Sequence, residues 1–254
     1  MIEAVLKNPT LFKNIVDAVK DLIVYGPFYF MENSMCLQAM NESQVSLVVL
    51  NFNKGFFELY RCDQPIILGI KVSDLSKIFK CAKSDDSCTI RFVDDSEFVT
   101  FIFENKKGRR HQASLKLFKQ NYEYLYIAEH PYTCFIDMPS MELQKIFRDI
   151  TSFSDTLSII ANNSEVSFKG EGYFATYKIS YVRANYNDDD ENRVKIIVNE
   201  NVRAQFTLKY LLVLAKAATI STRVCISVAD KLPILIEYKE NNFLFSYYLA
   251  PIVE

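Results

Sequence analysis

Four amphipathic windows recur along the 254-residue chain at nearly equal spacing. In each window apolar residues follow one another at i, i+3, i+4 and i+7, which is the pattern of a helix with one buried face. Each window opens with a Ser or Thr that could cap the first turn, namely Thr10, Ser73, Ser140 and Thr207. These residues lie 63, 67 and 67 positions apart, so the sequence predicts four copies of one unit, arranged as two domains of two units each.

The segments between the windows are rich in β-branched and aromatic residues and are interrupted by turn residues. Runs such as VSLVVL (45–50), EFVTFIFE (97–104) and RVCISVA (223–229) are typical of strands. One helix with several strands per unit predicts an α+β fold, in which the helices cover only one face of the sheets. The other face of each helix is therefore available to something else.

Composition sets limits on what the chain can do. Half of its residues are hydrophobic, which is enough for a sizeable core, and its formal net charge of −2 gives no overall attraction to nucleic acid. The six cysteines form no CxxC pair and are predicted to be buried free thiols, as in a reducing compartment. No run of about 18 uncharged apolar residues occurs, which indicates a soluble intracellular protein.

Cations lie opposite the apolar stripe of every window. The first window, for example, places Lys13 and Lys20 seven residues apart on that face. The full set is Lys13, Lys20, Lys77, Lys80, Lys145, Arg148, Lys209 and Lys216. On one helix such cations are ordinary solvated residues. Their fourfold repetition in a slightly acidic chain favours a positive surface that contacts phosphates without reading base sequence.

Seven blocks resemble the proliferating cell nuclear antigen family, in the same order along nearly the whole chain. They are LQAMNESQVSLVVL (37–50), YRCD (60–63), LSKIFKCAKSDD (75–86), DMPSMELQKIFRDI (137–150), LKYLLVLAKAAT (208–219), PILIEYK (233–239) and YYLAP (247–251). The resemblance implies two similar clamp domains, 1–117 and 134–254, joined by a connector at 118–133. It also implies a homotrimeric, pseudo-sixfold ring with helices lining the hole and antiparallel sheets forming the outer wall.

Such a ring encircles double-stranded DNA, independently of sequence, and acts in the nucleus as a polymerase processivity factor for replication and repair. The resemblance implies that the eight cations face the DNA. It further implies that DNA polymerases, the clamp loader, flap endonuclease and ligase dock through a short peptide with aromatic and aliphatic anchors. The residues implied for the peptide pocket are Met40, Val45, Leu47, Leu125, Ile127, Pro233, Tyr248, Leu249 and Ala250, with Gln44, Pro251 and Ile252 at its rim. Val45 and Leu47 fit a purely structural role in the core about equally well.

Some positions depart from the family pattern near the expected pocket. Gln44 stands where relatives often have a histidine, and in the connector Tyr126 and Ala128 replace a glycine and a proline. Partner selectivity is therefore expected to differ. Asn163 stands at the position of the family's ubiquitin-accepting lysine, so that modification does not carry over.

The subunit joint is expected where the strand around 109–117 pairs with the strand around 174–182 of the next subunit. Ala113 stands there at a position where relatives often have a large side chain. The stability of the ring is therefore left open. A specialised clamp paralogue, such as a checkpoint heterotrimer subunit or a viral processivity factor, remains the alternative.

Other signals favour no chemistry of their own. The acidic run 188–191 could serve a metal-dependent nuclease, but it lacks further ligands at fixed spacing, and a solvated loop is expected. The basic residues Lys106, Lys107, Arg109 and Arg110 fit a hairpin turn as well as a nuclear targeting patch. No HExxH, GxSxG, Walker A or dinucleotide-binding pattern occurs, so no catalytic site, metal or cofactor is expected.

Overall fold

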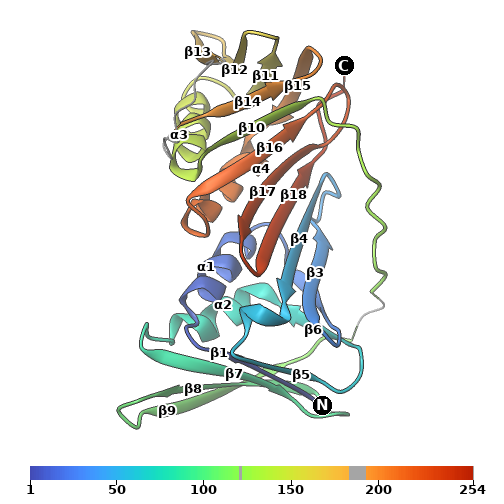
Figure 1. The fold of residues 1–254 in the computed structure, drawn as a ribbon, viewed down its shortest axis with the longest axis vertical. Helices are drawn as coiled ribbons and strands as arrows, with labels where there is room; N and C mark the ends of the chain where they lie inside the picture. Colours follow the sequence, from blue (N-terminus) through green and yellow to red (C-terminus); the bar gives the residue numbers. More distant parts are fainter. Residues whose placement is uncertain (120–121, 183–192, 254) are drawn as a thin grey trace. The chain divides into compact units, whose positions relative to one another are not determined.

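The computed structural model describes residues 1–119, 122–182 and 193–253, and the chain divides into two compact units (Figure 1). Unit 1 consists of residues 1–44, 48–125 and 240–245. Unit 2 consists of residues 45–47, 126–239 and 246–254. Each element below is assigned to the unit that holds most of its residues.

The described part of unit 1 contains two α-helices, a short 3-10 helix and nine strands. The helices are α1 (Thr10–Val19), η1 (Lys54–Phe56) and α2 (Val72–Lys80). The strands are β1 (Ile2–Leu6), β2 (Tyr25–Phe30), β3 (Ser34–Met40), β4 (Ser46–Asn53), β5 (Leu59–Cys62), β6 (Ile66–Lys71), β7 (Asp86–Phe92), β8 (Phe98–Asn105) and β9 (Arg110–Lys116).

The described part of unit 2 has a matching inventory. The helices are α3 (Ser140–Thr151), α4 (Leu208–Leu214) and the 3-10 helix η2 (Ala215–Thr219). The strands are β10 (Cys134–Pro139), β11 (Thr156–Ala161), β12 (Glu165–Glu171), β13 (Thr176–Val182), β14 (Lys195–Val198), β15 (Val202–Thr207), β16 (Arg223–Val228), β17 (Ile234–Glu240) and β18 (Phe243–Leu249).

A strand, a helix and three strands follow one another four times along the chain. The four copies begin at β1, β6, β10 and β15, and β5 and β14 are additional strands. The predicted fourfold repeat and the α+β class are therefore confirmed.

The two copies within each unit exchange one strand. In unit 1, β1 leaves its own copy and pairs with β7, with Ala4 opposite Ile90, while β6 pairs with β2, with Leu68 opposite Phe28. In unit 2, β10 pairs with β16 and β15 pairs with β11 in the same way. The resulting strand orders are β5-β1-β7-β8-β9 and β6-β2-β3-β4 in unit 1, and β14-β10-β16-β17-β18 and β13-β12-β11-β15 in unit 2. A single copy therefore cannot complete its own sheets.

The predicted apolar stripes of the helices lie in the core. Ile15, Leu75 and Ile146 are buried, as is Leu211 of α4. In unit 1 the stripes of α1 and α2 meet through aromatic rings, because the ring centroids of Phe12 and Phe79 lie 4.9 Å apart. Such packing holds each helix in one rotation, and this rotation decides which side chains face outward.

The predicted hydroxyl caps are wrong at three helices. Helix α1 begins at Thr10, α2 begins one residue before Ser73 and α3 begins at Ser140, and none of the three has a hydrogen bond from an N-cap side chain. At α1 the side-chain oxygen of Asn8 accepts the N–H of Thr10 instead, at 2.8 Å. Ser140 is buried, and its Oγ has no partner within the described residues.

The cysteines are free thiols, but only half of them are fully buried. Cys36, Cys88 and Cys134 are buried, Cys62 is half-buried, and Cys81 and Cys225 are exposed. Burial raises the pKa of Cys36 and of Cys134 to about 11, which keeps both thiols protonated at neutral pH. No helix among the described residues is long and apolar enough to cross a membrane.

Asp17 joins the two helices of unit 1. Its Oδ1 accepts hydrogen bonds from Ser76 Oγ of α2 at 2.6 Å and from Lys20 Nζ at 2.7 Å. Partial burial alone would raise the pKa of Asp17, but the bonds from Lys20 and Ser76 outweigh it, so the pKa lies below the ordinary value of 3.8. The ionised carboxylate is therefore the form that the folded state favours.

We expect Asp17→Asn to lower the free energy of unfolding at pH 7 by about 1 kcal/mol, because the amide loses charge-assisted bonds. A group whose pKa is lower in the folded state stabilises the protein above its unfolded pKa, and this contribution is lost as the pH falls. The difference from wild type, measured by urea unfolding, should therefore shrink between pH 7 and pH 3. Asp85→Asn, at an exposed position, is the control. An equal difference at both pH values would contradict this account.

Candidate functional site

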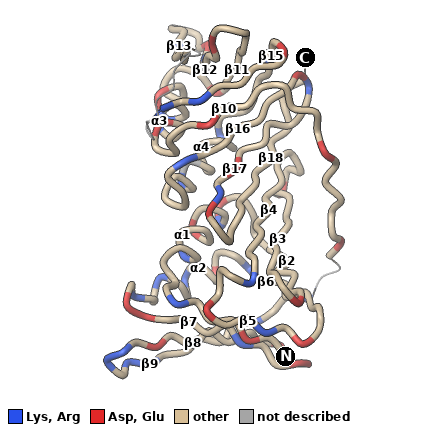
Figure 2. Tube along the Cα trace, viewed as in Figure 1, with Lys and Arg blue, Asp and Glu red and all other residues tan. Residues whose placement is uncertain are grey.

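The helix cations are mostly exposed, as the sequence predicts. Figure 2 marks the Lys and Arg positions in blue along the chain trace. Lys13 and Lys20 are half-buried, whereas Lys77, Lys80, Lys145, Arg148, Lys209 and Lys216 are exposed. The cations of α1 and α2 belong to unit 1, whereas those of α3, α4 and η2 belong to unit 2.

In unit 1 two of the cations are paired with an acid one turn earlier on the same helix. Lys20 lies 2.7 Å from Asp17, and its side chain is 23 % exposed, while Lys77 lies 2.7 Å from Asp74 and is 74 % exposed. The charge of Lys80 also acts on Asp17, so cations of both helices lie near one carboxylate. The Lys77–Asp74 pair is exposed, and such a pair contributes little to stability, so a phosphate can compete for Lys77.

In unit 2 the outer face of α3 forms a hollow of about 580 Å³. Lys145 and Arg148 line it together with Glu142 and Tyr181 of β13. The Tyr181 hydroxyl donates to Glu142 Oε1 at 2.5 Å, and burial raises the pKa of Tyr181. The acid of this hollow is therefore occupied by the tyrosine, whereas Lys145 and Arg148 form no ion pair with any residue that the structure describes.

The fourth helix differs from the prediction. Lys209 lies on α4, 4.7 Å from the ring centroid of Tyr210, but the α-helix ends at Leu214. Lys216 lies on the 3-10 helix η2, whose residues turn by about 120° instead of 100°. Sequence spacing alone therefore misjudges the direction of Lys216 relative to Lys209.

The start of the expected connector is bound to unit 1. The N–H of Phe118 donates to the carbonyl of Gly69 at 2.9 Å, and the N–H of Leu125 donates to Gln38 Oε1 at 3.0 Å. A Cβ atom on residue 69 would lie only 2.2 Å from the Phe118 carbonyl oxygen, so this close approach requires glycine.

The end of the connector and the C-terminal tail are bound to unit 2. The Tyr132 hydroxyl donates to the Pro233 carbonyl at 3.0 Å. The N–H of Ala250 donates to the Val45 carbonyl at 2.9 Å, and the N–H of Ile252 donates to the Gln205 carbonyl at 2.8 Å. Both segments thus present backbone and side chains from fixed positions.

The residues expected for the peptide pocket differ in their accessibility. In unit 2, Val45, Leu47, Ile127, Pro233, Tyr248 and Pro251 are half-buried, and Ala250 and Ile252 are exposed. In unit 1, Leu125 is half-buried, and Met40 and Gln44 are exposed. Leu249 is only 1 % exposed, so its side chain belongs to the core, and only its backbone could touch a ligand.

The bulky side chain of Tyr126 in the connector is exposed. The side chain of Tyr126 is 92 % exposed, while its neighbours Leu125 and Ile127 are half-buried. In an extended segment successive side chains point to opposite sides, so Tyr126 projects into solvent.

Two of the sheet-edge strands in the described chain, β9 and β13, bear on the subunit joint. β9 is the last strand of its sheet in unit 1, and β13 is the last strand of its sheet in unit 2. They match the segments expected at the subunit joint. An edge strand carries unpaired N–H and C=O groups, which another chain can satisfy. Ala113 lies half-buried on β9, opposite Phe101 of β8.

The acidic run 188–191 lies outside the described residues, so no structural statement applies to it. Elsewhere in the described chain, no three His, Cys, Asp or Glu residues come together as a metal site.

Comparison with known proteins places both halves of the chain in one family. Residues 1–124 match the family "Proliferating cell nuclear antigen, N-terminal domain", and residues 126–252 match "Proliferating cell nuclear antigen, C-terminal domain". The chain is 35 % identical to "Proliferating cell nuclear antigen" of Caenorhabditis elegans, over 100 % of this chain and 98 % of the relative. It is 37 % identical to "Proliferating cell nuclear antigen 2" of Drosophila melanogaster, over 99 % of this chain and 97 % of the relative. The chain therefore belongs to the proliferating cell nuclear antigen family, the DNA sliding clamps that act as processivity factors.

Proposed function

We propose that three copies of this chain close into a ring around duplex DNA, with the helices facing the DNA. The observation that carries this proposal is the recurrence of two cations in each of the four helical windows of a chain whose net charge is −2. Contacts with phosphates are independent of base sequence and weaken with salt. A closed ring tolerates weak contacts because it stays on the DNA by topology, so it can slide and still hold a polymerase.

The edge strands supply a means of closure. Pairing β9 of one copy with β13 of the next satisfies two open edges in a head-to-tail contact, and such contacts close a ring when the rotation fits. In this arrangement the clamp domains are 1–117 and 134–254, joined by the connector 118–133.

Partner enzymes dock on the outside through a short peptide. Ile127, Pro233 and Tyr248 offer half-buried apolar surface, and the tail Ala250–Ile252 belongs to the same unit. Half-buried apolar side chains are suited to receive aromatic and aliphatic anchors. Met40, Gln44 and Leu125 are included on the ground of the resemblance alone.

The family is a non-catalytic scaffold, and we assign no catalytic activity to this chain. DNA polymerases, the clamp loader, flap endonuclease and ligase are the proposed partners. Their substrate is nuclear DNA, so we place the protein in the nucleus.

The mass in solution tests the ring. Light scattering over a dilution series at near-physiological salt should give three times 29.4 kDa. Ala113→Asp should shift the equilibrium toward monomers, because it places a charge on the joining edge strand. Leu59→Asp on β5, the opposite edge strand of the same sheet, is the control and should leave the mass unchanged. A wild-type monomer at every concentration would instead favour the specialised paralogue, whose ring needs other subunits.

Reversing one helix cation tests the DNA-facing surface. Arg148→Glu should weaken the binding of the loaded ring to DNA and reduce polymerase stimulation, because one phosphate contact is lost in each of three subunits. The slope of log affinity against log salt should fall by about 3. Lys239→Glu, which makes the same charge change at an exposed position on β17, should behave as wild type. Equal behaviour of the two variants would remove α3 from the DNA surface.

Removing a proposed anchor contact tests the peptide surface. Ile127→Ala and Tyr248→Ala should each weaken the binding of a fluorescent partner peptide by about 30-fold, as expected of a central interface residue. Tyr126→Ala is the matched control, because this neighbouring side chain points into solvent. Fluorescence anisotropy gives the affinities, and light scattering confirms that the trimer persists. A larger loss for Tyr126→Ala than for Ile127→Ala would refute the proposed orientation of the connector.

A further inference from the structure

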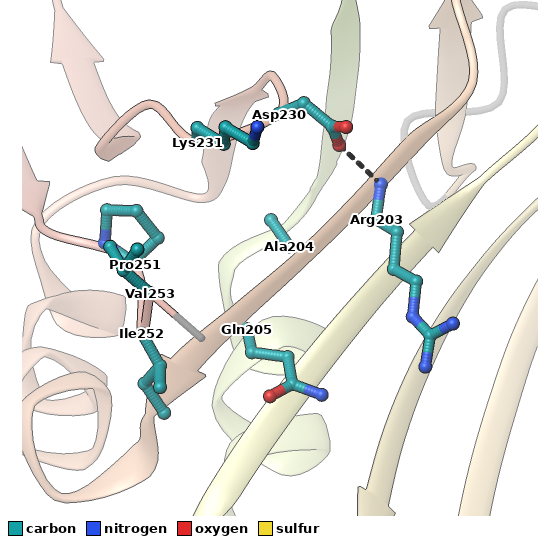
Figure 3. A pocket seen from close by; sticks show the side chains of 8 residues that line it. All are labelled: Arg203, Ala204, Gln205, Asp230, Lys231, Pro251, Ile252 and Val253. Atoms are coloured by element: carbon teal, nitrogen blue, oxygen red, sulfur yellow. Dashed lines mark hydrogen bonds between the residues drawn. The ribbon is translucent and has the colours of Figure 1, made fainter.

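A second pocket, of about 320 Å³, lies beside the C-terminal tail in unit 2 (Figure 3). Residues Arg203–Gln205 of β15 form one wall, and the tail residues Pro251–Val253 form another. Asp230 and Lys231, in the turn between β16 and β17, complete the lining. The tail is fixed there because the N–H of Ile252 donates to the Gln205 carbonyl at 2.8 Å.

The pocket carries an excess of positive charge. Arg203 and Lys231 are both exposed, and neither forms an ion pair with a carboxylate in the part of the chain that the structure describes. Asp230 is the only acid of the described lining, and its Oδ1 already accepts the backbone N–H of Arg203 at 2.9 Å. Glu171 interacts electrostatically with Arg203 without forming an ion pair with it. The Glu171 carboxylate accepts a hydrogen bond from Lys169 and does not line the pocket.

The backbone at Lys231 is in an unfavourable conformation. Its φ of +59° lies in the left-handed region, which glycine adopts at lower cost than a residue with a side chain. Glycine at this position would make the turn easier but would remove the cation from the pocket. The strained residue Lys231 is therefore also the one that places a positive charge beside the tail.

We propose that this pocket binds acidic side chains that flank the anchors of a partner peptide. The inference rests on the proposed function, because Pro251 and Ile252 belong both to the rim of the proposed peptide surface and to the lining of this pocket. A peptide that extends along the tail brings its flanking residues to Arg203 and Lys231. These two cations attract a Glu or Asp side chain in that flank, whereas they repel a Lys or Arg side chain.

The test uses peptides with identical anchors. In one series the N-terminal flank carries two Glu, two Ser or two Lys, and in a second series the C-terminal flank carries them. At low salt the wild-type trimer should bind the Glu peptide about five-fold more tightly than the Lys peptide, for the end that passes the tail. The double variant with Arg203→Gln and Lys231→Gly should lose this preference and bind the Ser peptide with unchanged affinity. Glu254, which lies outside the described residues, is kept in every variant so that its charge cancels from the comparison.

Three controls separate the possible outcomes. The melting temperature of Lys231→Gly should equal or exceed that of wild type, so a lost preference cannot be attributed to unfolding. If the Ser peptide binds but Glu and Lys flanks bind equally, this inference fails and the proposed docking function stands; if no peptide binds, both fail. A short DNA duplex is titrated against the same double variant. Weaker duplex binding with an unchanged flank preference would assign the two cations to DNA and overturn the inference.

Discussion

The exchange of one strand between neighbouring copies is the constraint on which the rest of the structure depends. β1 and β6 each complete the sheet of the other copy in unit 1, and β10 and β15 do the same in unit 2. A copy alone would leave backbone groups unpaired and the apolar stripe of its helix uncovered. The pair of copies is therefore the smallest arrangement that satisfies both, and this fixes two helices per unit with cations on their outer faces.

That arrangement explains how a nearly neutral chain can hold a charged surface. Once the apolar stripes are fixed by packing such as that of Phe12 against Phe79, the remaining faces of the helices are left with lysine and arginine. Some acids near these cations are shared with other donors: Asp17 pairs with Lys20 but also accepts from Ser76, and Glu142 accepts from Tyr181. The outer faces of the helices are therefore basic because of where the charged residues lie, although the net charge of the chain is slightly negative.

Much of this was predictable from the sequence because its signals are local. Helical periodicity located all four helices, and turn residues with β-branched runs indicated the strands between them. The exchange of strands was not predictable, since it joins residues as distant as Ala4 and Ile90 with no local mark. The caps failed because Pro9 and Pro139, and not a hydroxyl residue, precede two of the helices. The pocket beside the tail was missed because Arg203 and Lys231 appear in the sequence as two separate solvated cations.

The same strand exchange has a consequence for biosynthesis. β1 leaves the ribosome well before its partner β7, which lies more than 80 residues later in the chain. Synthesis adds about 5–20 residues per second, so β1 remains for seconds without β7. Non-local pairing of this kind slows folding and exposes the nascent chain to wrong partners, including the equivalent strand of another copy on the same message. Each unit therefore folds only after both of its copies have been synthesised. A nascent chain that ends between the two copies contains no part of that unit that is stable alone.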